Sequence, residues 1–149
     1  MKIVPIPALD DNYIWLIHDE ESAVCVDPGD AAPVLALLQQ KQLDLDAIIL
    51  THHHNDHIGG VADLQAAFPD VAVYGPEDIA CVNQALKEGQ ELNLLGQVWR
   101  VWFVPGHTHN HLAYILRIEG KNRLHVFCGD TLFSARCGRV FTGPIDQFE

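Results

Sequence analysis

The stretch that decides how this chain folds is THHHNDHIGG, residues 51–60. It places four histidines and one aspartate within the six positions from His52 to His57. The whole chain has nine histidines, where average composition predicts roughly three. At the end of a strand, alternate residues point to the same side, so His52 and His54 converge on one point while His53 faces away. The pattern therefore predicts a metal site rather than a solvated polar loop.

A second binding point is expected nearby, where the chain turns from the strand into a helix. Asp56 and His57 stand at the start of that helix, and their side chains can point back towards the strand end. We therefore expect ligands for two metals, rather than one, in this stretch. Gly59 and Gly60 have no side chains, so the first turn of the helix can pack closely against the sheet or the metal loop.

Two later stretches supply further candidate ligands. The sequence VPGHTHNH at 104–111 places His107 directly after a Pro-Gly turn, and FCGDTLF at 127–133 places Asp130 after an apolar strand. Imidazole and carboxylate ligands without thiolates favour a catalytic zinc, iron or manganese site over a structural one. The two-metal interpretation gives one metal His52, His54 and His107, and the other Asp56, His57 and Asp130, with Asp130 able to bridge. A single-metal interpretation uses the three histidines of the first set and Asp130.

The composition limits the class of protein and of partner. With 149 residues, 48% of them apolar, the chain suits one domain, 1–149, with a substantial core. A net charge of −11 argues against nucleic acid or an anionic membrane as a partner, because phosphate recognition needs clustered cations. No stretch has the character of a membrane span or a signal peptide, and the four cysteines form no CxxC pair. We expect a reduced, cytoplasmic monomer.

Short apolar runs alternate with helix-like stretches along the chain, which indicates an α/β fold. Strands are predicted at 13–18, 22–26, 47–50, 71–74, 98–104, 111–118 and 124–127. Helices are predicted at 31–42, 56–68 and 77–86. Each polar cluster follows a strand, which is where open α/β sheets gather their ligand sites.

These motifs resemble those of the metallo-β-lactamase superfamily, over essentially the whole chain. THHHNDH matches its HxHxDH signature, PGHT at 105–108 its third ligand loop, and GDTLF at 129–133 the strand of its bridging aspartate. Asp27, in the turn DPGD, resembles the superfamily's early structural aspartate. Within the superfamily, DNYIW at 11–15 and CGDTLFSARCGR at 128–139 are similar to the glyoxalase II family of hydroxyacylglutathione hydrolases.

The resemblance implies an αββα sandwich with the metals between its sheets. It implies two divalent metal ions, zinc in the first place and iron or manganese as alternatives. It also implies S-D-lactoylglutathione as a small-molecule substrate, hydrolysed to D-lactate and glutathione. A hydroxide shared by the metals would attack the thioester carbonyl, with Asp56 and Asp130 as the catalytic carboxylates. His111 and Asp27 are expected to form hydrogen bonds to the metal ligands without binding the metals themselves.

The chain departs from the family pattern in three places. The family's last histidine ligand and its C-terminal helical domain lie beyond position 149, so we expect a C-terminally incomplete catalytic domain. Asn110 stands where the family has a glycine. Of the family's glutathione-contacting pair, Arg139 matches the basic residue, whereas Phe141 replaces a tyrosine and cannot donate a hydrogen bond.

Two other hypotheses stay open at this point. Persulfide dioxygenases share the metal loop and a similar GDTLF run, and they would hold one iron. An incomplete chain could instead be an inactive metal-binding fragment. The number of bound metals separates the hypotheses: two for the hydrolase, one iron for the dioxygenase, and one or none for the fragment.

Overall fold

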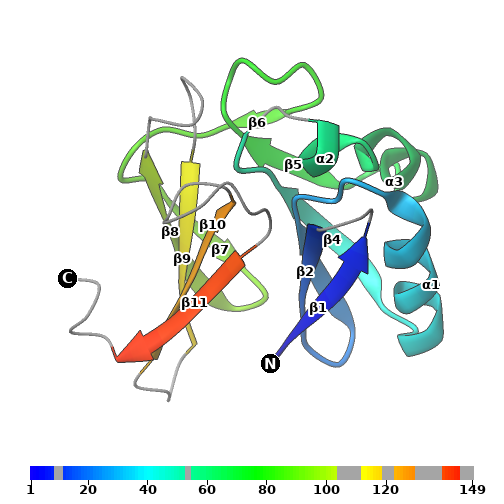
Figure 1. Cartoon of the computed structure of the whole chain (residues 1–149), viewed down its shortest axis with the longest axis horizontal. Helices are drawn as coiled ribbons and strands as arrows, with labels where there is room; N and C mark the ends of the chain where they lie inside the picture. The colour runs from blue at the N-terminus through cyan, green and yellow to red at the C-terminus, as the bar shows by residue number, and fades with distance from the viewer. Residues whose placement is uncertain (9–11, 53–54, 104–111, 119–122, 130–138, 145–149) are drawn as a thin grey trace.

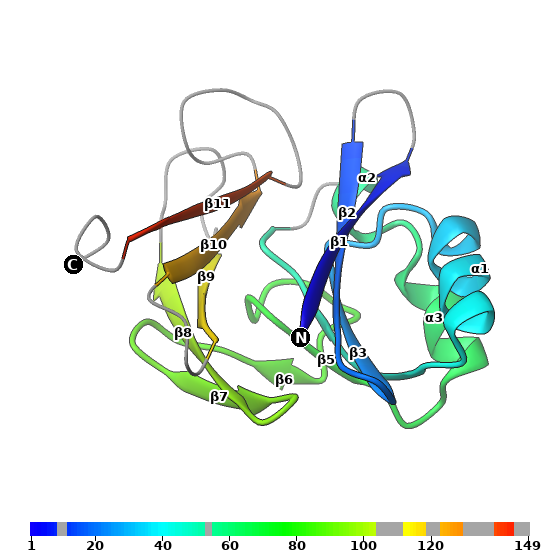
Figure 2. The same ribbon diagram turned by 90° about the horizontal axis from the view of Figure 1, so that it is seen from below.

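Two β-sheets pack face to face, and helices cover the outer face of one of them (Figure 1 and Figure 2). In the computed structural model, the described residues are 1–8, 12–52, 55–103, 112–118, 123–129 and 139–144. At positions 12, 55, 56, 123, 128, 129 and 139–144 the description is of the backbone. The α/β class predicted from the sequence is confirmed.

The first sheet has six strands in the order β1-β2-β3-β4-β5-β6. The first three strands pair antiparallel, and β3 to β6 pair parallel. Because parallel strands end at the same edge, the residues that follow β3, β4 and β5 lie side by side there. The strands are β1 (Lys2–Ala8), β2 (Asn12–His18), β3 (Ser22–Val26), β4 (Asp44–Ile49), β5 (Ala72–Gly75) and β6 (Gln84–Ala85).

The second sheet has five strands in the order β11-β10-β9-β8-β7, and all of its pairings are antiparallel. Its edge strand β11 follows β10 in the chain and lies beside it in Figure 1. The strands are β7 (Glu91–Leu94), β8 (Gln97–Phe103), β9 (Leu112–Arg117), β10 (Arg123–Gly129) and β11 (Arg139–Pro144).

Alternation along the strands divides their side chains between two cores. In β2, Ile14 and Leu16 pack with the helices, whereas Trp15 and Ile17 pack with the second sheet. Trp15 also makes an edge contact with Phe127 of β10, with ring centroids 6.5 Å apart. The contact lies between the two sheets and joins β2 to β10.

The two longer helices lie on the outer face of the first sheet, and a single helical turn precedes the second of them (Figure 2). The helices are α1 (Ala31–Lys41), the single turn α2 (Asn55–Ile58) and α3 (Val61–Ala67). The Asp30 side chain caps α1 by accepting a hydrogen bond from the Ala32 amide at 3.2 Å. No helix in the described part of the chain has the length and apolarity to span a membrane.

All seven predicted strands are present, with ends that differ by at most three residues. The predicted helix at 56–68 is broken into α2 and α3, and Gly60 explains the break. Its amide donates to the Pro28 carbonyl at 2.8 Å, across to the loop after β3, instead of continuing the helix. A Cβ on Gly60 would lie 2.6 Å from the Ala31 nitrogen, so the close packing predicted for this glycine is confirmed.

The predicted helix at 77–86 is wrong, because this segment pairs with the edge of β5. The Asn83 amide donates to the Val73 carbonyl at 3.0 Å, and the Asn83 side chain accepts from the Val73 amide at 2.9 Å. β6 then continues as a parallel strand. The backbone groups that a helix would pair internally are used here to extend the sheet.

Besides β6, three more strands were not predicted: β1, β7 and β11. β1 contains Pro5 and Pro7, and β11 contains a glycine and a proline, which weaken the sequence pattern of a strand. β7 has four residues and follows a Gly-containing turn. In the described residues, β1, β7 and β11 are edge strands, where the rules of strand composition are most relaxed.

Candidate metal centre

Asp27 and Thr51 meet because β3 and β4 are parallel neighbours in the first sheet. Val26 at the end of β3 pairs with Ile49 at the end of β4, so the next residues of both strands emerge together. The Thr51 amide donates to Asp27 Oδ1 at 2.7 Å, and the Thr51 hydroxyl donates to Asp27 Oδ2 at 2.6 Å. Both residues are buried. A carboxylate is thus fixed at the strand edge by two donors from one residue.

Asp27 also has a backbone conformation that is uncommon for a residue with a side chain. Its φ is 51°, in the left-handed region where aspartate is more tolerated than most residues. Its amide donates to the Ile49 carbonyl at 3.0 Å. The turn after β3 is therefore held by hydrogen bonds on both the backbone and the side chain of Asp27.

His52 is oriented through the hydroxyl of its neighbour, Thr51. His52 Nδ1 lies 2.9 Å from Thr51 Oγ1. Because that hydroxyl gives its one proton to Asp27, its oxygen accepts from His52, and the hydrogen-bond network thereby assigns the imidazole proton to Nδ1. The lone pair of the neutral ring then lies on Nε2, which is the form that binds a metal through Nε2.

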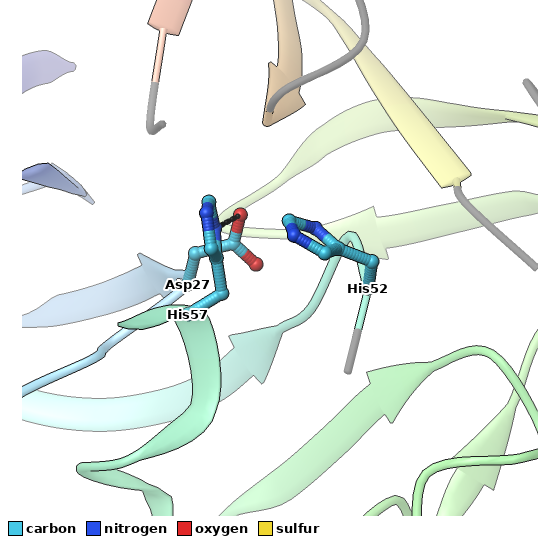
Figure 3. A group of neighbouring side chains, drawn as sticks. All are labelled: Asp27, His52 and His57. Atoms are coloured by element: carbon cyan, nitrogen blue, oxygen red, sulfur yellow. Dashed lines mark hydrogen bonds and ion pairs between the residues drawn. The ribbon is translucent and has the colours of Figure 1, made fainter. Parts of the chain in front are cut away.

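His57 reaches the same carboxylate directly, from the single turn α2. Its Nδ1 lies 2.8 Å from Asp27 Oδ2, which again places the proton on Nδ1 and the lone pair on Nε2. The rings of His52 and His57 lie next to each other, with centroids 4.1 Å apart and planes tilted by 52° (Figure 3). One buried carboxylate therefore sets the orientation of two buried imidazoles.

The electrostatics of Asp27 suit a charged carboxylate. Burial by itself raises the pKa of Asp27, but the attraction of the His57 ring in its protonated form, the hydrogen bond from His57, and the smaller effects of His52 and the Thr51 hydroxyl outweigh burial and hold that pKa below its ordinary value. An ionised Asp27 strengthens its hydrogen bonds with His57 and with the Thr51 hydroxyl, which in turn accepts from His52.

The donor chemistry of this cluster fits a divalent metal ion. Ligand-type atoms of Asp27, His52 and His57 all lie within 4.8 Å of one another, and all three residues are buried. Both oxygens of Asp27 already accept hydrogen bonds from Thr51, and one of them also accepts from His57. The two imidazoles are therefore the side chains that could hold a metal ion, and Asp27 is placed to orient them.

The structure brings together three of the residues singled out from the sequence, namely Asp27, His52 and His57. The other candidate ligands and outer partners His54, His107, His111 and Asp130 lie outside the described residues. For Asp56 in α2, and for Arg139 and Phe141 in β11, the backbone is described. The two-metal ligand set and the substrate contacts stay predictions.

Sequence reasoning missed Thr51. Its hydroxyl joins Asp27 to His52, yet the sequence analysis singled out histidines and aspartates and gave Thr51 no role. A signal was present: a hydroxyl residue stands between a buried apolar strand and the first histidine, where a buried polar group must have a hydrogen-bond partner. Identifying that partner required the pairing of β3 with β4.

The chain is similar in sequence and in fold to known proteins. The family model of the metallo-beta-lactamase superfamily matches residues 8–147. Hydroxyacylglutathione hydrolase of Vibrio campbellii is 51% identical to this chain over 150 residues, which cover 99% of this chain and 57% of that protein. The chain thus spans little more than half the length of this relative.

Solved structures of related proteins share the fold. The crystal structure of BLEG-1 B3 metallo-beta-lactamase has a TM-score of 0.77 and 26% identity, and the match covers 93% of this chain and 76% of that one. ETHE1 from Myxococcus xanthus has a TM-score of 0.72 and 30% identity, with 89% and 59% covered. The expected fold is confirmed, and on the match to the family model the chain belongs to the metallo-beta-lactamase superfamily.

Proposed function

We propose that this chain is a metal-dependent thioester hydrolase that cleaves S-D-lactoylglutathione to D-lactate and glutathione. The observation that carries the proposal is the buried network in which Asp27 fixes His57 directly and His52 through Thr51. Two imidazoles with their Nε2 lone pairs set in this way are suited to a catalytic metal. The substrate class is supported by the 51% identity to a hydroxyacylglutathione hydrolase.

The proposed centre holds two divalent ions, zinc in the first place and iron or manganese as alternatives. Residues 1–149 are proposed to form one catalytic domain, acting as a cytoplasmic monomer on a small-molecule thioester. The proposed ligands of one ion are His52, His54 and His107, and those of the other are Asp56, His57 and Asp130, with Asp130 bridging.

Divalent ions bound at this centre would supply a hydroxide at neutral pH and an electrophile for the thioester oxygen. The residues of the chain have separate tasks. Asp27 and Thr51 keep the imidazole protons on Nδ1, so that His52 and His57 present Nε2. Asp56 is proposed to orient the hydroxide. No nucleophilic side chain is needed for thioester cleavage by this route.

The proposed substrate contacts lie in β11. Arg139 is proposed to pair with a carboxylate of the glutathione moiety, because a guanidinium binds carboxylates through two parallel hydrogen bonds. Phe141 is proposed to pack against the peptide backbone of the substrate. His111 is proposed to hold one of the ligands by a hydrogen bond.

The test is hydrolysis of S-D-lactoylglutathione by the 149-residue chain loaded with zinc. A chelated sample and the His52→Ala variant are the controls. We expect thioester cleavage that the chelator and the substitution both abolish. A folded, zinc-bound chain without turnover would contradict the proposed activity.

The same samples separate the alternatives that the sequence left open. Two bound zinc ions per chain support the hydrolase. One iron with oxygen consumption on a glutathione persulfide would favour the dioxygenase. One bound metal without either activity would favour an inactive metal-binding chain.

A further inference from the structure

The two sheets are joined by hydrogen bonds at the strand end that bears the histidines. The hydroxyl of Tyr114 in β9 donates to the Leu50 carbonyl at 2.6 Å, and the Leu112 amide, also in β9, donates to the Thr51 carbonyl at 2.9 Å. The two consecutive carbonyls that follow β4 by one and two residues thus accept from one strand of the second sheet. The next residue along the chain is His52.

Tyr114 is suited to hold this position. Its side chain is fully buried in the core between the sheets. Burial, together with the charge of Asp27, raises the pKa of the Tyr114 phenol well above its ordinary value, so the hydroxyl stays a donor. The Leu50 amide donates to the Tyr74 carbonyl of β5 at 2.9 Å, so Leu50 is anchored on its amide side as well.

The same strand is directly connected to a second predicted ligand stretch. Leu112 immediately follows the segment 104–111, which carries His107 and His111. Thr51 immediately precedes His52 and orients its ring. The hydrogen bond between Leu112 and Thr51 therefore fixes the distance between the points where the two ligand-bearing segments leave the sheets.

We propose that Tyr114 is a positioning residue for the metal centre: it fastens the end of β4 to β9, and so sets the position of the backbone that leads through Thr51 into His52. This inference rests on the metal centre of the proposed function. The hydroxyl is the part that matters, because a phenylalanine would fill the same apolar space and leave the buried Leu50 carbonyl without its donor.

The test compares Tyr114→Phe with Leu116→Val in the 149-residue chain. Leu116 is also fully buried, in the same strand and the same core, and it pairs with Trp99 and His125 away from the metal end of β9. Zinc affinity is measured by competition with a chromophoric chelator, and the visible absorption of the Co²⁺-loaded chain reports the coordination geometry. Circular dichroism and thermal melting establish that each variant is folded at the temperature of the titration.

We expect Tyr114→Phe to bind zinc about tenfold more weakly and to change the Co²⁺ absorption band, as loss of outer support around metal ligands does. We expect Leu116→Val to melt earlier, with zinc affinity and Co²⁺ absorption unchanged. Wild-type zinc affinity in Tyr114→Phe, or an equal loss in both variants, would overturn the positioning role. If the unaltered chain itself binds no zinc, the metal centre of the proposed function fails, and this inference fails with it.

Discussion

Asp27 and Thr51 stand 24 positions apart in the chain and are joined by two hydrogen bonds, one from the Thr51 amide at 2.7 Å and one from its hydroxyl at 2.6 Å. Because of this pair, the parallel pairing of β3 with β4 also determines how the imidazole rings are oriented. Through it, the turn after one strand determines the ring orientation of a histidine after the next strand.

Replacing Thr51 by valine tests this arrangement. Valine keeps the shape but removes the hydroxyl, so His52 Nδ1 loses its acceptor and Asp27 loses one donor. We expect zinc affinity to fall by about 10–100-fold and the free energy of unfolding to fall by about 1–3 kcal/mol. Thr51→Ser keeps the hydroxyl and is the control in a chelator-competition titration. Equal zinc affinity in the two variants would contradict the role of the Thr51 hydroxyl in orienting His52.

Gly60 is the position where a single methyl group should be most damaging to the loop behind the site. In Gly60→Ala, the new Cβ would lie 2.6 Å from the Ala31 nitrogen and 2.8 Å from the Pro28 oxygen, both backbone atoms that cannot move independently. We expect the free energy of unfolding in urea to fall by about 1–3 kcal/mol. Gly59→Ala, at an exposed neighbour, should be close to neutral. An unchanged free energy of unfolding in both variants would show that the loop at 28–31 moves to make room for the Gly60→Ala methyl group, and would contradict the prediction.

His53 and His54 provide a matched pair for the alternation argument. If His54 is a ligand and His53 faces away from the metals, His54→Ala should lose about one metal ion per chain and the thioesterase activity, whereas His53→Ala should keep both. Metal content by elemental analysis and initial rates are the measurements. A similar loss in the two variants would mean that the alternation does not continue beyond His52.

Asp19 gives a prediction about pH, far from the metal site. Hydrogen bonds from the backbone amides of Glu21 and Ser22, at 2.8 and 2.7 Å, hold the pKa of Asp19 below its ordinary value. A lowered folded-state pKa stabilises the fold above the unfolded-state pKa, about 3.9, and the stabilisation is lost as the pH falls through the folded-state value. Wild type should therefore lose its advantage over Asp19→Asn in that acidic window. Glu20→Gln, an exposed neighbour, controls for net charge, and a pH-independent difference would contradict the assignment.

The interior strands of both sheets and the presence of a histidine cluster at one strand end could be predicted from the sequence because they depend on local pattern. Apolar runs such as 22–26 mark buried strands, and the concentration of histidines after β4 marks a site. What could not be predicted depends on contacts between distant segments. Gly60 breaks a helix because it meets the loop at 28–31, and 77–86 becomes turns and a strand because the edge of β5 accepts it. The role of Thr51 is of the same kind, since its partner lies on a neighbouring strand.

The two prolines that weakened the strand pattern of β1 also affect whether copies of this chain can associate through that edge of the sheet. β1 is an edge strand in the described residues, and a proline is tolerated there where its missing N–H would face away from the partner strand. Pro5 and Pro7 share that orientation, so the outward side of β1 lacks two successive donors. A strand from another molecule would find carbonyl acceptors but no matching ladder, so this edge is protected against strand addition and the aggregation that follows from it.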